Sequence, residues 1–167
     1  MVSISTDDVK RLRDETGAGV MDSKRALEEA GGDFNRAKEL LREHGAAAAA
    51  KRSERSTGQG LVESYIHGGR VGALVEVNCE TDFVARTDTF KALARDVAMQ
   101  VAAMNPLGLT EDDVPTDAPG ERKAHALLEQ AFIKDPSRTI RDLVQEAIAQ
   151  TGENVRVARF SRFELGA

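Results

Sequence analysis

The sequence predicts an α+β fold in which a helical module precedes a small antiparallel sheet covered by helices. Residues 1–55 carry apolar side chains at helical spacing between capping residues and glycines. In residues 61–77, apolar and polar side chains alternate on both sides of Gly68 and Gly69. This pattern indicates a β-hairpin, because both central residues of a type I′ turn need positive φ, which glycine adopts readily. We therefore divide the chain into a three-helix module with its linker, residues 1–55, and an α+β core, residues 56–167.

Composition excludes several classes of protein. The net charge of −5 argues against a protein whose binding depends mainly on nucleic-acid phosphates. The one cysteine, Cys79, excludes an internal disulfide and a Cys-clustered metal site, and suits a reducing compartment. The N-terminus lacks the pattern of a signal peptide, and the apolar run of residues 46–50 is too short to span a membrane. We expect a cytoplasmic protein with no metal, no membrane contact and no direct nucleic-acid contact.

Three short helices are expected in the module, each too short to be stable alone. Packed together they would be similar to a ubiquitin-associated domain. Alanine-rich residues 46–50 are expected to continue the third helix or to form a fourth. The basic residues that follow, up to Arg55, are interpreted as a solvated linker and not as an RNA contact. The expected caps are Ser5 or Thr6, Asp22 and Asp33, and the expected helix ends lie at residues 16–19, 31–32 and 44–45.

The core is expected to form one small sheet covered by helices, since a helix packed across a hairpin buries its apolar face. Its helical segments carry apolar residues on one side. The expected elements are strands at 61–67 and 71–77, helices at 89–104, 121–130 and 139–151, a turn at 132–139, and a final strand at 154–165.

A polar segment connects the hairpin to the first core helix and contains one large apolar ring, Phe83, between Asp82 and Arg86. By pattern alone, the ring is expected to turn inward and fix the segment to its own core. The alternative is a probe that enters a partner's pocket.

Two motifs resemble the signatures of the elongation factor Ts family, the exchange factors of the GTPase elongation factor Tu. Residues 12–27 resemble the first signature, with Ser23 where the family usually has Cys and Val20 where it often has Met. Residues 76–86 resemble the second, and a final strand ending in Glu-Leu-Gly also matches the family.

The resemblance implies two sets of partner contacts. Phe83 would wedge between helices of the GTPase beside its Mg²⁺ site, and the N-terminal module would dock on another face. Leu12 is also expected to belong at least partly to the helix core. The implied exchange residues are Thr81, Asp82, Phe83, Val84 and Arg86, and the implied docking residues are Leu12, Arg13, Val20 and Met21.

The core has a single copy of its strand–strand–helix pattern, whereas many bacterial members have a duplicated core. The chain thus resembles the short form of the family, in which two chains pair their cores. Since the open edges of a three-stranded sheet need covering, we expect a homodimer.

No catalytic pattern stands out. The three histidines show no metal-ligand spacing, and no phosphate loop follows Gly68. Cys79 with His67 as its base is a possible nucleophile, but a small buried side chain at a strand end is the preferred interpretation. We expect no enzyme and no cofactor.

Two functions from different classes remain. One is a guanine nucleotide exchange factor, and the other is an adaptor that binds nascent chains or ubiquitin folds through its three-helix module. Residues 81–86 favour the first, because an adaptor has no need of this segment.

Overall fold

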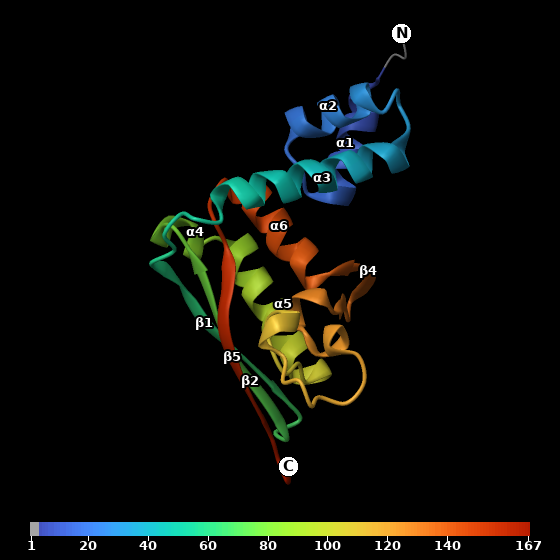
Figure 1. The fold of residues 1–167 in the computed structure, drawn as a ribbon. Coiled ribbons are helices and arrows are strands. Elements are labelled where there is room, and N and C mark those ends of the chain that lie inside the picture. The colour runs from blue at the N-terminus through green and yellow to red at the C-terminus, as the bar shows by residue number, and fades with distance from the viewer. Residues whose placement is uncertain (1–3) are drawn as a thin grey trace.

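The computed structural model describes residues 4–167; residues 1–3, which belong to the N-terminal stretch where no signal peptide is expected, lie outside it. The chain folds into a helical module and an α+β core, and one long helix runs from the first to the second (Figure 1). The predicted fold class and the order of module and sheet are confirmed.

The module contains helices α1 (Thr6–Thr16), α2 (Val20–Glu29) and α3 (Phe34–Arg52). Ser5 begins α1 with a capping box, in which its hydroxyl accepts the N–H of Asp8 and the Asp8 carboxylate accepts the N–H of Ser5. Asp33 caps α3 as predicted. The buried apolar residues of the module are Val9, Leu12, Ala26, Leu27, Ala37 and Leu40.

One predicted cap in the module is wrong, and one of two alternatives for the end of α3 is confirmed. Gly19, not Asp22, precedes α2, and Asp22 lies in the first turn, where its carboxylate favours the positive helix end. α3 passes the helix end expected at residues 44–45 and continues through the alanines to Arg52, which confirms the first of the two expectations for residues 46–50, because alanine is the strongest helix former. This extension brings Ala49 against the apolar cluster of the core, so α3 belongs to both parts of the molecule.

The core sheet has three antiparallel strands in the order β1 (Gln59–His67), β2 (Val71–Cys79) and β5 (Arg156–Glu164). His67 pairs with Val71 across Gly68 and Gly69, whose φ angles are 56° and 68°. The predicted hairpin is confirmed. Its central strand β2 buries Ala73, Val75, Val77 and Cys79 on the inner face.

Helices α5 (Asp88–Met104) and α6 (Ile140–Thr151) cover that inner face, with α5 directly on the sheet. The apolar side predicted for each helix is buried. Thr87 caps α5, and Thr139 with Asp142 forms a capping box at the start of α6. The buried residues on the apolar sides of the two helices include Phe90, Leu93, Ala94, Val97 and Val101 of α5, and Ile140, Leu143, Val144, Ala147 and Ile148 of α6.

The segment between α5 and α6 differs from the prediction. It contains the 3-10 helices η1 (Glu111–Asp113), η2 (Arg122–His125) and η3 (Leu127–Glu129), instead of an α-helix over 121–130. The backbone N–H groups of Leu127 and Leu128 donate to the carbonyls of Gly108 and Leu109, which removes them from a continuous helix. Residues 132–139, predicted as a turn, form part of a small hairpin of β3 (Ala131–Phe132) and β4 (Asp135–Thr139).

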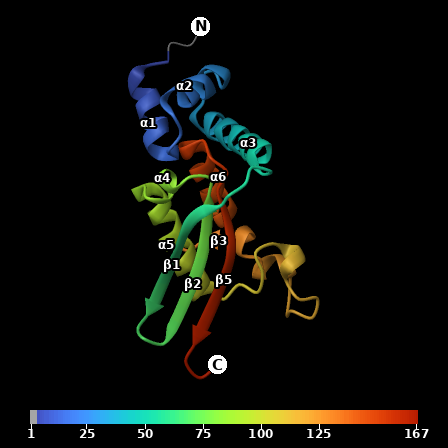
Figure 2. The ribbon, with the colours of Figure 1, turned by 90° about the vertical axis from the view of Figure 1, so that its left-hand side faces the viewer.

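The outer face of the main sheet is not covered by helices (Figure 2). Four apolar side chains on its three strands are exposed: Val62 and Ile66 of β1, Leu74 of β2 and Phe163 of β5. The ion pair of Glu76 with Arg159 (2.7 Å) lies on the same face. The outer face therefore combines exposed apolar side chains with polar ones and, unlike the inner face, is not covered by helices.

Candidate functional site

Phe83 projects from a single helical turn, α4 (Asp82–Ala85), that follows β2 directly. Its side chain is 85% exposed, so the expectation that the ring turns inward is wrong. Ala85 is buried instead, and residues two apart in a helix point in nearly opposite directions, about 200° apart. Burial of Ala85 thus turns Phe83 toward solvent. Both views place α4 at the end of the sheet nearest to the module (Figures 1 and 2).

The charged residues beside the ring pair with each other. A guanidinium nitrogen of Arg86 lies 3.0 Å from the Asp82 carboxylate across the turn, and both side chains are largely exposed. Val84 is half-buried. The turn therefore presents one large apolar ring flanked by an exposed ion pair.

Cys79 lies under this turn and is fully buried, as preferred in the sequence interpretation. Its thiol donates a hydrogen bond to the Thr81 carbonyl at 3.1 Å. Burial raises the pKa of the Cys79 thiol, with Glu153 acting in the same direction, so the thiol remains a protonated donor at neutral pH. His67 lies at the opposite end of the hairpin, which excludes a Cys79–His67 pair.

The predicted docking residues lie on neighbouring parts of α1 and α2. Val20 and Met21, in the first turn of α2, are 55% and 66% exposed. Arg13, in the last turn of α1, is also exposed. Leu12 is 0% exposed among the module helices, so its side chain stabilises the module and does not present a contact surface.

Sequence reasoning missed Glu153, which lies two residues after the end of α6 and contacts the start of the Phe83 turn. Its carboxylate accepts hydrogen bonds from the N–H and hydroxyl of Thr81, at 3.0 and 2.6 Å. The two residues are 72 positions apart, and no local pattern connects them. The one available signal was an acidic residue next to Gly152, where the predicted helix ends.

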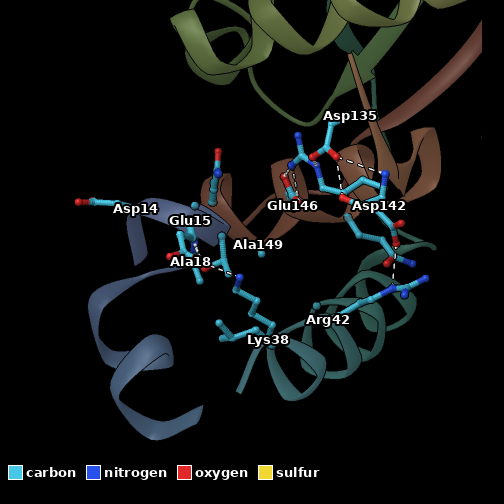
Figure 3. Close-up of a pocket in the computed structure, with 17 residues that line it drawn as sticks. Asp14, Glu15, Ala18, Lys38, Arg42, Asp135, Asp142, Glu146 and Ala149 are labelled. Carbon is cyan, nitrogen blue, oxygen red and sulfur yellow. Dashed lines mark hydrogen bonds and ion pairs between the residues drawn. The ribbon is translucent and has the colours of Figure 1, made fainter. Parts of the chain in front are cut away.

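A groove of about 740 Å³ separates the module from α6 and β4 (Figure 3). Its charged side chains are paired with one another: Lys38 with Glu15 at 2.6 Å, and Arg138 with Glu146 at 2.6 Å. Burial raises the pKa of Glu146, although the Arg138 guanidinium acts in the opposite direction. The groove is therefore interpreted as a polar seam between the two parts of the molecule.

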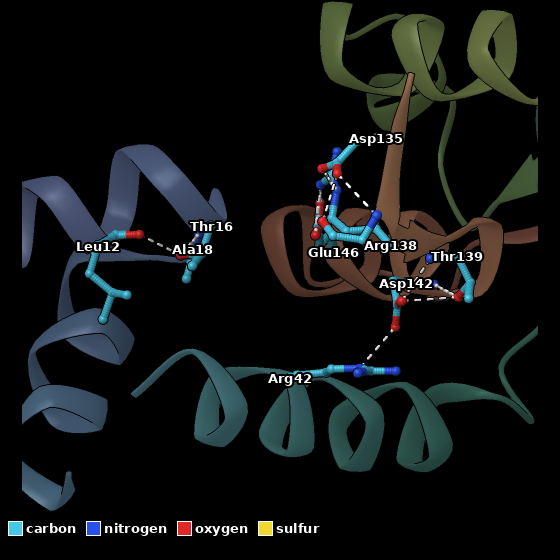
Figure 4. A network of polar contacts seen from close by, with 10 residues as sticks. Leu12, Thr16, Ala18, Arg42, Asp135, Arg138, Thr139, Asp142 and Glu146 are labelled. Carbon is cyan, nitrogen blue, oxygen red and sulfur yellow. Dashed lines mark hydrogen bonds and ion pairs between the residues drawn. The ribbon is translucent and has the colours of Figure 1, made fainter. Parts of the chain in front are cut away.

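Direct contacts cross this seam. Arg42 of α3 reaches Asp142 at the start of α6, with 3.1 Å between nitrogen and oxygen (Figure 4). A side chain at Gly17, in the turn between α1 and α2, would collide with Gln150 near the end of α6. α6 thus contacts the module, and the residue that follows it by two positions, Glu153, contacts the Phe83 turn.

Within residues 4–167, no three His, Cys, Asp or Glu side chains are grouped so that they could hold a metal ion. No helix in the same range is long and apolar enough to cross a membrane.

The fold and site define a small two-part α+β protein that presents exposed apolar residues on turns of both its module and its core. The family model described as Elongation factor TS matches residues 35–125. The chain is 49% identical to Elongation factor Ts of Carboxydothermus hydrogenoformans, over 98% of this chain and 89% of that protein. It is 48% identical to Elongation factor Ts of Herpetosiphon aurantiacus, over 99% and 100% of the two chains, and 45% identical to that of Thermotoga petrophila, over 99% and 98%.

The chain therefore belongs to the elongation factor Ts family, as its two motifs predicted. Its role is that of a translation elongation factor.

Proposed function

We propose that this protein binds the GDP-bound form of elongation factor Tu in the cytoplasm and accelerates release of GDP, so that GTP can bind. The observation that carries this proposal is the exposed ring of Phe83 on a turn held by hydrogen bonds. A large apolar side chain that is exposed to water contributes little to the stability of its own fold, but it can enter a pocket of a partner and bury its surface there. The protein acts as an exchange factor without chemical catalysis, without a cofactor and without direct contact to nucleic acid.

Two contacts share the work. The module docks on the GTPase through Arg13, Val20 and Met21, and the flexible Met21 side chain adapts to the partner surface. Docking brings the turn of residues 81–86 to a second place on the same GTPase. The separation of these two surfaces on the protein allows one to supply affinity while the other disturbs the nucleotide site.

At the second contact, Phe83 inserts between two helices of the GTPase beside its Mg²⁺ site. Asp82 and Arg86 engage polar groups around the ring, and Thr81 and Val84 complete the contact surface. Because the phosphate-binding loop and Mg²⁺ hold GDP in such GTPases, moving these helices weakens the contacts that retain the nucleotide.

The exchange step is a coupling between two binding sites. Nucleotide and exchange factor weaken each other's binding by the same factor, so entry of GTP releases the exchange factor. No bond of the nucleotide needs to be made or broken.

Release of a fluorescent GDP analogue from bacterial elongation factor Tu tests the proposal. The release rate, measured with excess unlabelled GDP, is expected to rise with the concentration of this protein and to reach a plateau. A folded protein that leaves the rate unchanged would contradict exchange and would favour the adaptor that binds nascent chains or ubiquitin folds.

The outer sheet face supports a second part of the proposal, a homodimer in which two cores pack face to face. Val62, Ile66, Leu74 and Phe163 make this face apolar, and such exposed patches mark protein contacts. Light scattering should give the mass of two chains for the wild-type protein and of one chain for Leu74→Glu. Leu107→Glu, which alters an exposed apolar residue outside the sheet, is the control and should remain dimeric. A monomeric wild-type protein at working concentration would contradict the dimer.

A further inference from the structure

Glu153 forms a clamp on the residues that precede the Phe83 turn. One oxygen of its carboxylate accepts the backbone N–H groups of Glu80 at 3.1 Å and Thr81 at 3.0 Å. The other oxygen accepts the Thr81 hydroxyl at 2.6 Å. Within residues 4–167, no basic side chain lies within ion-pair distance of Glu153. These three donors therefore supply the protein partners of its carboxylate, and hydrogen bonds to an ionised acceptor are the strong ones.

The Thr81 hydroxyl transmits this clamp to the turn itself. Because its hydrogen points to Glu153, its oxygen lone pairs are available to the backbone N–H of Val84, the third residue of α4, whose nitrogen lies 3.4 Å away. A single helical turn is not stable without such support. The orientation of Phe83, the second residue of α4, thus depends on a hydroxyl that Glu153 orients.

A reciprocal contact strengthens the connection. The backbone N–H of Asn154 donates to the Glu80 carboxylate at 2.6 Å, so the segments 80–81 and 153–154 each donate to the other. The Asn154 side chain also donates to the carbonyls of Ser53 and Arg55, at 3.3 and 2.8 Å. The Phe83 turn is therefore held against both the end of α6 and the linker that follows α3.

We propose that Glu153 is a positioning residue for nucleotide release, which holds Phe83 at the angle needed to enter the GTPase. This inference rests on the proposed exchange function. The competing explanation is that Glu153 only stabilises the fold. The bonds to Thr81 are exposed to solvent, where each contributes little to global stability.

Glu153→Gln tests the proposal because it keeps the size of the side chain and removes its charge and one acceptor oxygen. In the GDP-release assay, we expect the plateau rate to fall about tenfold, since small displacements of a positioned group cost large factors in rate. The concentration for half-maximal release should remain within about twofold, because the module supplies docking. The thermal midpoint of unfolding should change by no more than about 3 °C.

Two further variants separate positioning from general stability. In a Phe83→Ala background, Glu153→Gln should cause no additional loss, because the ring that it positions is gone. Asp113→Asn is the matched control, since the Asp113 carboxylate also accepts the N–H and hydroxyl of one threonine, Thr110, at 2.9 and 2.7 Å. Asp113 lies in η1, so Asp113→Asn should leave both the plateau rate and the half-maximal concentration unchanged.

A wild-type plateau rate for Glu153→Gln, or an equal loss in the Phe83→Ala background, would overturn the proposal. Amide hydrogen exchange of the free protein tests the clamp separately from the exchange function. The Val84 amide should exchange faster in Glu153→Gln than in wild type, while the amides of α5 keep their protection. Unchanged hydrogen exchange at the Val84 amide would overturn the clamp. A wild-type protein that fails to accelerate GDP release from elongation factor Tu would instead overturn the proposed function.

Discussion

Replacing Phe83 with alanine should abolish most of the exchange activity and leave the fold intact. The ring is 85% exposed and is not part of either apolar cluster of the protein. Substitutions at such surface positions change the free energy of unfolding by no more than about 0.5 kcal/mol. The variant should therefore unfold at nearly the same temperature as the wild-type protein.

The expected loss of activity follows from the surface that the ring buries in its partner. Aromatic side chains bury about 150 Å² or more, and apolar burial contributes about 25 cal/mol per Å². If this burial occurs at the step that releases GDP, removing the ring costs about 3 to 4 kcal/mol. A loss of this size lowers the plateau rate by a factor of about 10² to 10³.

The assay is release of the fluorescent GDP analogue at saturating concentrations of each variant, combined with a thermal unfolding curve. Phe83→Leu should give an intermediate rate because it keeps part of the apolar surface. Leu107→Ala, which shortens an exposed apolar residue in the loop after α5, should behave as wild type. A plateau rate for Phe83→Ala within about threefold of wild type would refute the wedge.

Three other predictions concern the module. Ser23→Ala should raise the free energy of unfolding by about 1 kcal/mol, because the buried Ser23 hydroxyl has no hydrogen-bond partner among the described residues. Chemical denaturation of this variant checks the prediction. Ser56→Ala, at an exposed position, is the control and should be neutral. Met21→Ala should raise the concentration for half-maximal GDP release about tenfold with little change in the plateau rate, and the reverse pattern in a titration would contradict docking by the module. Hydrogen bonds from Lys38 and Arg11 lower the pKa of Glu15 below its ordinary value of 4.5, so the stability it contributes is present above pH 4.5 and is lost as the pH falls through its lowered value. The difference in thermal midpoint between wild type and Glu15→Gln should accordingly shrink on acidification from pH 7 to pH 3, and a constant difference would argue against the ion pairs of Glu15.

Local patterns were sufficient to predict the hairpin, the apolar sides of α5 and α6, and the caps of α1 and α3. Each of these depends on residues close together in sequence, such as Gly68 with Gly69 or Asp33 with Asn35. The segment from residue 121 to 130 was mispredicted as a helix because its backbone donors bond to carbonyls at residues 108 and 109, which no local pattern reveals.

The candidate site shows the same limit. Its motif identified Phe83, but the periodicity of a four-residue turn was too short to decide whether the ring points inward. Burial of Ala85 decides it, and that depends on tertiary packing. Glu153 could not be predicted either, since its contact with Thr81 joins residues 72 positions apart.

The position of α6 connects the two proposed contact surfaces. Its first turn is joined to α3 through Asp142 and Arg42, and Glu153 after its last turn holds Thr81. In the proposed function, docking through the module would place the Phe83 turn on the GTPase through this short chain of direct contacts. This arrangement fits a protein that must bind and disturb its partner at once.

The proposed exchange mechanism is tested most directly by the affinity of this protein for elongation factor Tu, measured by calorimetry with nucleotide-free GTPase and with GTPase saturated with GDP. The exchange mechanism predicts weaker binding in the presence of GDP, by the same factor by which this protein weakens GDP binding. Equal affinity for the two forms would contradict the mechanism, because a protein that binds the nucleotide-free and GDP-bound forms equally well cannot change the affinity for GDP.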